Sequence, residues 1–232
     1  MKGLHLAAAQ GDAAAVRRLA REVRSRLEAS LHNIKDIGEE YALDGSYGVT
    51  ALMVAAALGR DAVVRELLTL GADRERQDAA GMTAVYFACQ YDQPATLNIL
   101  IDAGAAVDGA CHATWIRPLA WAALHASLEC VKLLLTRGRG KIDVNAQDAK
   151  GATALHHAAL KRYPQMVAAL LAAGADPNVR DNRGHTPLDE ARDDFFDVLI
   201  DDAETEATIA LLEGAFEGND DETVVMGYNN AQ

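Results

Sequence analysis

The sequence predicts an all-α solenoid, in which short helix–turn–helix repeats stack side by side behind an N-terminal helical cap. One pattern of turn, short helix, longer helix and turn recurs along most of the 232 residues. Half of the residues are hydrophobic but only 5% are aromatic, which suits a core of small side chains between closely packed helices. The expected first-helix starts are separated by 33, 34, 36 and 33 residues, and they stand at Thr50, Thr83, Arg117, Thr153 and Thr186.

The clearest copy of the pattern covers residues 148–179. Asp148–Gly151 has the composition of a tight turn, and Thr153 is a suitable N-cap for the short helix that follows. Ala158 and Ala159 are small enough for a neighbouring helix to approach closely, and Gly174 is placed to end the second helix. One such repeat cannot bury its own apolar face, so it needs copies stacked beside it.

A short motif follows each expected turn. It reads Thr50-Ala51-Leu52, Thr83-Ala84-Val85, Arg117-Pro118-Leu119, Thr153-Ala154-Leu155-His156 and Thr186-Pro187-Leu188. The motif and the spacing resemble the ankyrin repeat family, with its 33-residue period and T-P-L-H-x-A signature. The resemblance covers residues 1 to about 216 and implies an ankyrin-repeat solenoid. It also implies that His156, at the signature histidine, ties the turn to the helix.

We expect one elongated domain over residues 1–216 and an acidic flexible tail over 217–232. A cap over 1–44 should precede five repeats near 45–75, 76–108, 109–146, 147–180 and 181–216. The cap's second helix should start near Ala13, and residues 31–45 exceed the repeat period, so they form either a longer cap helix or a loop. The second helices are expected to end at Gly71, Gly104, Gly138, Gly174 and Gly214.

The third and fifth repeats depart from the pattern. Trp115 stands where other turns have glycine, Arg117 replaces the capping threonine, and the third turn holds one extra residue. The fifth repeat has seven additional residues in or near 193–206, because the spacing from Thr186 to Gly214 is 28 rather than 21. An exposed tryptophan in a turn favours a role in binding, and the alternative is that it folds inward to fill the irregular turn.

Charge is concentrated at one end of the chain. The net charge is −12, and residues 189–222 hold fourteen acids against one base, which gives −13 there and +1 elsewhere. A protein with this balance is a poor candidate for reading nucleic acid. The acidic end favours either a solvated face or an attraction to basic proteins.

The sequence predicts no catalytic residues, no metal site and no cofactor. Adjacent His156 and His157 point about 100° apart on a helix, so they do not readily share one ion. No phosphate-binding loop or nucleophile turn occurs, and the three cysteines have no paired spacing. Packing is the expected role of each cysteine. Without a membrane-length apolar run we expect a cytoplasmic monomer that does not bind membranes, with the nucleus as the alternative compartment.

The resemblance implies that the turn tips and the first helices line a concave face that binds a protein partner. By register, that surface holds Tyr47, Val49, Leu58, Met82, Gln90, Tyr91, Trp115, Ile116, Leu124, His125, Lys150, Lys161, Arg183 and His185. The first three repeats supply apolar and aromatic groups, and the last two supply charge. The leading hypothesis is therefore a non-enzymatic interaction module. The alternatives are an acidic decoy or chaperone for basic proteins and a regulator of an enzyme.

Overall fold

The structure, a computed structural model, describes residues 2–19, 48–138, 140–192 and 202–220. Every regular element within these ranges is a helix, in agreement with the predicted fold class. The chain divides into two compact units, residues 1–142 and 143–232, which we call unit 1 and unit 2 and describe separately. Predictions for residues 31–45, for most of the insertion in the fifth repeat and for the end of the tail lie outside the described residues.

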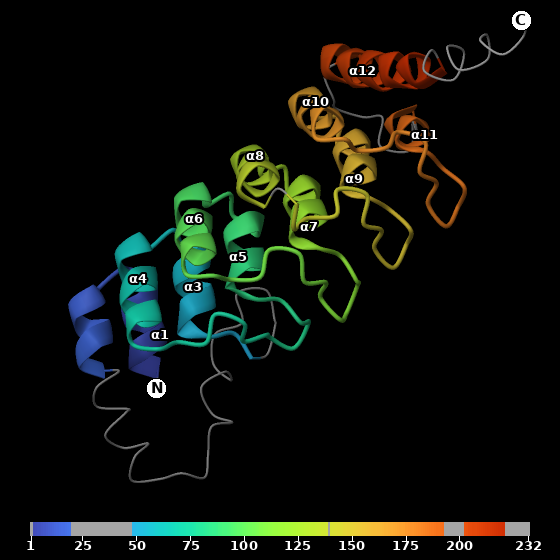
Figure 1. The fold of residues 1–232 in the computed structure, drawn as a ribbon. Helices are drawn as coiled ribbons and strands as arrows, with labels where there is room; N and C mark the ends of the chain where they lie inside the picture. Colours follow the sequence, from blue (N-terminus) through green and yellow to red (C-terminus); the bar gives the residue numbers. More distant parts are fainter. Residues whose placement is uncertain (1, 20–47, 139, 193–201, 221–232) are drawn as a thin grey trace, which may run out of the picture. The chain divides into compact units, whose positions relative to one another are not determined.

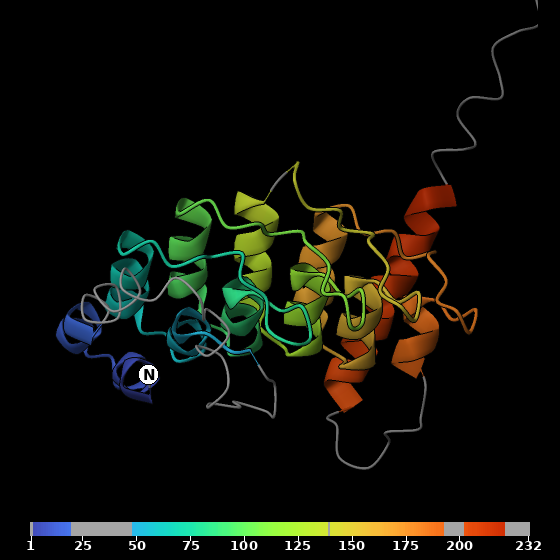
Figure 2. The same cartoon turned by 90° about the horizontal axis from the view of Figure 1, so that it is seen from below.

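Unit 1 holds the cap and three helix pairs. The cap consists of α1 (Lys2–Gln10) and a helical stretch over residues 13–19. The pairs are α3 (Ala51–Ala57) with α4 (Asp61–Thr69), α5 (Ala84–Gln90) with α6 (Pro94–Asp102), and α7 (Pro118–Leu124) with α8 (Leu128–Arg137). The first helices α1, α3, α5 and α7 pack in one row and α4, α6 and α8 in a second row, as Figures 1 and 2 show. The stacking buries the apolar faces that single repeats leave open.

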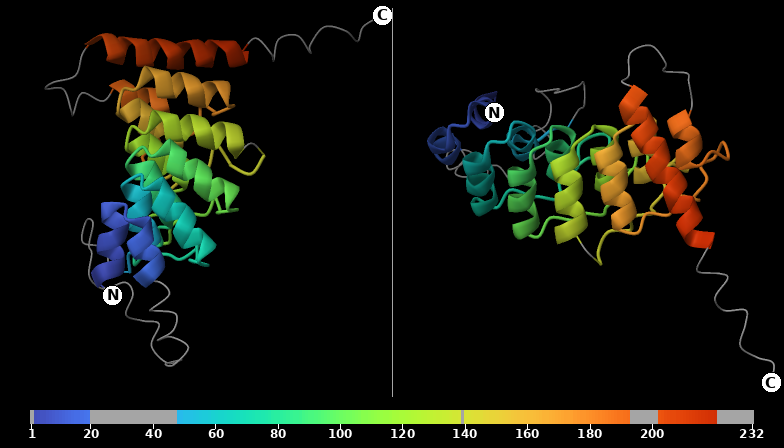
Figure 3. Two further views of the ribbon diagram at one scale, coloured as in Figure 1. Left: turned by 90° about the vertical axis from the view of Figure 1, so that its left-hand side faces the viewer. Right: turned by 90° about the horizontal axis from the view of Figure 1, so that it is seen from above.

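Unit 2 holds the pair α9 (Ala154–Leu160) and α10 (Pro164–Ala172), followed by α11 (Pro187–Arg192) and α12 (Asp202–Asp220). Helix α11 packs on α9, and α12 packs on both α10 and α11. Figure 3 shows that α12 is much longer than the helices it covers. It therefore takes the place of a second helix and closes this stack.

Threonine hydroxyls cap first helices as the sequence predicts. Oγ1 of Thr50, Thr153 and Thr186 accepts a hydrogen bond from the backbone N–H three positions later, at 3.3, 3.4 and 3.3 Å. At Thr83 and Arg117 the side chain makes no capping bond to its helix. Helix α7 begins instead with Pro118, whose fixed φ suits the first helical position.

A buried donor in one repeat ties it to the next. In the cap, in repeat two and in repeat four, a side chain from the first helix donates a hydrogen bond to a carbonyl in the following repeat. That carbonyl belongs to the residue just before the next helix-start residue. The bonds are His5 Nε2 to Val49 O (3.2 Å), Tyr86 Oη to Ile116 O (2.8 Å) and His156 Nε2 to His185 O (3.1 Å). The expected link from His156 to the turn is thus present, and His5 and Tyr86 make the equivalent link in their repeats.

Of the five predicted helix-end glycines, only Gly214 is wrong. Gly71, Gly104 and Gly174 follow their helices with φ of +85°, +80° and +89°, the left-handed conformation that glycine adopts without steric cost. Gly138 caps α8 with φ of −87°, and Gly214 lies inside α12. Without a stop at Gly214, α12 continues to Asp220, past the boundary expected at residue 216.

Candidate functional site

Three of the described hairpin turns are each held by one carboxylate. In Asp78, Asp148 and Asp181, Oδ1 accepts the backbone N–H groups of the second and fourth residues that follow, at 2.8–3.0 Å. The backbone N–H of the same aspartate is bonded to the carbonyl of that fourth residue. These bonds fix the turn, so the residues at its tip are presented in a defined conformation.

The third turn is built differently. Cys111 stands at the aspartate position, and its N–H bonds to the carbonyl of Ile116, five residues on instead of four. The extra residue places Trp115 in the left-handed region, with φ of +56°, where the turns of the neighbouring repeats have glycine. The Trp115 side chain is not folded inward, because 64% of the residue is exposed.

The tip of the third turn rests on the second turn. His112 Nε2 donates to Ala79 O at 3.1 Å, and the Ala113 N–H donates to Ala80 O at 3.3 Å. At the base of the third turn, the Tyr86 hydroxyl also lies 2.5 Å from Gly109 O. The turn is therefore fixed at both ends.

The ends of the first helices in unit 1 expose apolar and aromatic side chains. Leu58 after α3 is 40% exposed, and Tyr91 after α5 is 38% exposed. After α7, the exposed His125 ring packs against Trp121, with ring centroids 4.5 Å apart. Within the described part of unit 1, these residues and Trp115 form the apolar component of the predicted binding surface.

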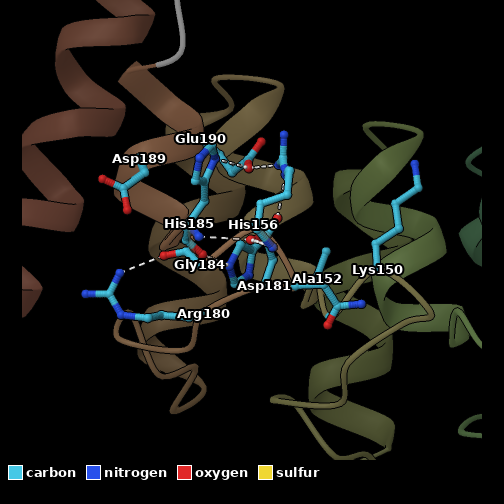
Figure 4. A network of polar contacts seen from close by, with 12 residues as sticks. Lys150, Ala152, His156, Arg180, Asp181, Gly184, His185, Asp189 and Glu190 are labelled. Carbon is cyan, nitrogen blue, oxygen red and sulfur yellow. Dashed lines mark hydrogen bonds and ion pairs between the residues drawn. The ribbon is translucent and has the colours of Figure 1, made fainter.

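The corresponding positions of unit 2 are charged. Lys150 and Lys161 are exposed, and Arg183 donates to Asp181 Oδ2 at 2.9 Å and to Glu190. The ring of His185 also contacts Glu190, 3.3 Å away. Glu190 is only 4% exposed, so its carboxylate is stabilised by Arg183 and His185 and not by solvent. Figure 4 shows this network from close by.

The two adjacent histidines of α9 serve different partners. His156 Nδ1 accepts the Thr153 N–H at 3.2 Å, so Nε2 carries the proton that bonds to His185 O. Burial lowers the pKa of His156, which keeps the ring neutral at physiological pH. His157 Nε2 lies 3.0 Å from Asp148 Oδ2 instead. The expectation that these rings do not share an ion agrees with this divergence.

The Asp148 carboxylate is ionised more easily than usual. Burial by itself would raise its pKa, but hydrogen bonds from His157 and from the N–H groups of Ala152 and Lys150 outweigh burial and lower it. In repeat two the residue nine positions after the turn aspartate is Phe87 in place of histidine. Asp78 Oδ2 is consequently buried without a hydrogen-bond partner.

The structure presents most of the predicted surface and corrects it at two positions. Val49 and Ile116 are 1% and 3% exposed, so their side chains turn into the core while their carbonyls accept the donors of the preceding repeats. Tyr47 lies outside the described residues. Of the others, Leu58, Tyr91, Trp115, His125, Lys150, Lys161 and Arg183 are exposed, and Met82, Gln90, Leu124 and His185 are half-buried.

Sequence reasoning placed Asp148 in a turn, but it missed the hydrogen bonds that its carboxylate accepts there, and it missed buried Glu190. The signal is present, since a polar residue nine positions after the turn aspartate recurs in repeats four and five, as His157 and Glu190. Among the described residues no cluster of histidine, cysteine and carboxylate side chains is arranged to hold a metal ion. In the same part of the chain, no helix is both long and apolar enough to cross a membrane.

Comparison with known proteins gives consistent matches. Models of ankyrin repeats match residues 4–111, 117–149 and 137–191. Human B-cell lymphoma 3 protein is 29% identical over 225 residues, covering 82% of this chain and 47% of that protein. Human neurogenic locus notch homolog protein 1 is 34% identical over 161 residues, covering 69% of this chain and 6% of that protein. The chain thus spans less than half the length of these relatives.

A solved structure matches along nearly its whole chain. It is a chain from the complex of a predatory endopeptidase of Bdellovibrio bacteriovorus with an immunity protein. The TM-score is 0.68 at 28% identity, and the match covers 92% of this chain and 98% of that chain. This match also covers nearly all of the other chain, in contrast to the curated relatives.

Proposed function

We propose that this chain, which belongs to the ankyrin repeat family, is a non-enzymatic interaction module that holds a protein partner on its first helices and hairpin tips. Ankyrin repeats act as protein-binding modules, and in each unit the first helices and hairpin tips would carry that role. Apolar groups on unit 1 would be buried against the partner, and charged groups on unit 2 would set its orientation.

One observation carries the proposal. The described part of unit 1 has four large exposed apolar residues, of which Leu58, Tyr91 and Trp115 belong to first-helix ends or a turn tip and Leu6 lies within the cap helix α1. The same register in unit 2 holds exposed Lys150 and Lys161. Single exposed apolar residues are common on any protein, but their recurrence at one repeat position favours a shared surface.

Affinity capture with matched variants tests this proposal. The immobilised chain, a Leu58→Ser/Tyr91→Ser variant and a Lys132→Ala control are exposed to the same extract, and bound proteins are identified by mass spectrometry. Lys132 lies on α8, in the second-helix row, and is exposed. We expect a specific protein to be retained by wild type and the control and lost by the double variant. Loss with Lys132→Ala alone would instead place binding on the second helices.

The matched complex favours a second candidate, the control of an enzyme by direct binding. The similarity covers 98% of a chain taken from an assembly of an endopeptidase and an immunity protein. We propose that this chain binds an enzyme of that kind. Isothermal titration with the predatory endopeptidase and an assay of its peptidase activity test the idea. Absence of binding at about 100 µM, where a complex stabilised by about 5.5 kcal/mol would be half formed, would exclude it for that enzyme.

A further inference from the structure

The third hairpin tip, residues 111–116, carries an isolated exposed indole. At 64%, Trp115 has the largest exposed fraction among the large hydrophobic residues of the described chain. The residues just before it, His112, Ala113 and Thr114, are exposed and small or polar, and Ile116 after it is buried. Within the third hairpin tip, the Trp115 ring is therefore not part of a larger exposed apolar patch.

The conformation of the tip disfavours tryptophan. Trp115 has φ of +56°, and glycines occupy the corresponding positions at +76° to +91° in the other described turns. A bulky side chain in the left-handed region is strained, and such strain is typically found at functional sites. Since the side chain is exposed, its packing inside the protein does not compensate for the strain.

The tip is also held in place before any partner arrives. Its bonds to the second turn fix His112 and Ala113, and Cys111 Sγ contacts Thr114 Oγ1 at 3.0 Å. The Trp115 N–H donates to Cys111 O at 2.9 Å. A side chain on a braced loop loses less conformational entropy on binding than one on a free loop.

We infer that the third hairpin tip is a rigid plug, which inserts the Trp115 indole into an apolar pocket on a folded partner protein. An isolated ring is buried fully only by a pocket that encloses both of its faces, and a flat surface or an extended peptide covers one face. The pocket should also contain a hydrogen-bond acceptor for the indole N–H. This inference rests on the proposed function and specifies the partner's shape.

The test uses the predatory endopeptidase of the matched complex as the probe. Titration calorimetry compares wild type with Trp115→Gly, Tyr91→Ser and the Lys132→Ala control. Trp115→Gly removes the ring and introduces the residue that the other described turns have at this position. The variant should therefore fold normally, which a thermal melt verifies, so a loss of binding reports on the ring itself. We expect Trp115→Gly to weaken binding at least ~30-fold and Lys132→Ala to change it less than ~2-fold.

A spectroscopic measurement reports on the pocket directly. The chain has two tryptophans, so a Trp121→Phe variant leaves Trp115 as the only indole of this chain. Quenching of this indole by acrylamide should fall when the endopeptidase is added, after subtraction of the endopeptidase signal. Trp115→Phe should retain part of the affinity, because the ring still fills the pocket without the N–H.

The possible outcomes separate the plug from the proposed function. If Trp115→Gly binds within ~3-fold of wild type while Tyr91→Ser weakens binding, the plug is wrong and the first-helix surface stands. Unchanged quenching of Trp115 in the complex would also overturn the plug. If wild type does not bind the endopeptidase, the enzyme-directed function is excluded for that enzyme, and the plug is overturned if Trp115→Gly retains the same protein from the extract as wild type.

Discussion

His157 of unit 2 corresponds to Phe87 of repeat two, so the His157→Phe variant introduces the residue that repeat two has at this position. The wild-type ring donates to Asp148 Oδ2 at 3.0 Å, and the two side chains are 11% and 7% exposed. His157→Phe preserves a ring of similar size but leaves Oδ2 buried without a donor. The two backbone bonds to Oδ1 remain. An unsatisfied buried acceptor costs about 1–3 kcal/mol, so we expect the free energy of unfolding to fall by about 2 kcal/mol.

Urea denaturation at pH 7, with hydrogen exchange to locate the change, measures this loss. Protection should fall in α9 and the turn before it, and unit 1 should keep its protection. Adding Asp148→Asn to His157→Phe should recover part of the stability, since a neutral amide is less costly to leave unpaired than a carboxylate. An unfolding free energy within about 0.5 kcal/mol of wild type for His157→Phe alone would refute the reasoning.

The contribution of the Asp148–His157 contact to stability should depend on pH in the acid range. The pKa of Asp148 is lowered in the folded protein from 3.8, so its stabilising contribution is present above that pH and is lost as the pH falls through the folded value. The difference in stability between wild type and His157→Phe should therefore shrink below about pH 3.8. A difference that stays constant into this range would show that the ionised carboxylate is not its source.

Three further predictions concern single positions. Phe87→His should give Asp78 Oδ2 a partner and raise the unfolding free energy by about 1 kcal/mol in urea denaturation, and a loss would show that burial of the phenyl ring is worth more. Ala126→Gly should raise it by roughly 0.5–1 kcal/mol, because alanine at φ of +62° is strained; an unchanged or lower melting temperature contradicts this. His156 has a pKa lowered from 6.5 by burial, so its contribution is complete above pH 6.5 and is lost as the pH falls below it; His156→Gln should flatten the stability profile there.

The repeat fold was predictable because its signals are local and periodic. Threonine caps, turn glycines and small first-helix residues recur at nearly constant spacing, so each repeat confirms the register of the others. The end of the fifth repeat was not predictable in this way. Gly214 resembles a helix stop by spacing alone, but neighbouring helices stabilise α12 through it, and tertiary packing overrides the local preference.

The binding surface was predictable only at the level of register. Spacing correctly places Leu58 and Tyr91 at exposed helix ends, and it indicates that Trp115 occupies a glycine position. Spacing does not reveal that Val49 and Ile116 turn inward, because half-buried His185 has the same register and the same carbonyl contact. Nor does it reveal that buried Glu190 recruits Arg183, since that pairing appears only after the turn and helix have folded together.

The ties between repeats have a consequence for synthesis of the chain. His5, Tyr86 and His156 each donate forward, to a carbonyl 44, 30 and 29 residues later in the sequence. On the ribosome, each donor is therefore translated before its acceptor exists, and its repeat emerges with a polar group that water must satisfy. Nascent repeats should become resistant to proteolysis one repeat behind the emerging chain. Arrest after residue 108 should leave the Tyr86 hydroxyl of repeat two without either of its acceptors, Gly109 O and Ile116 O.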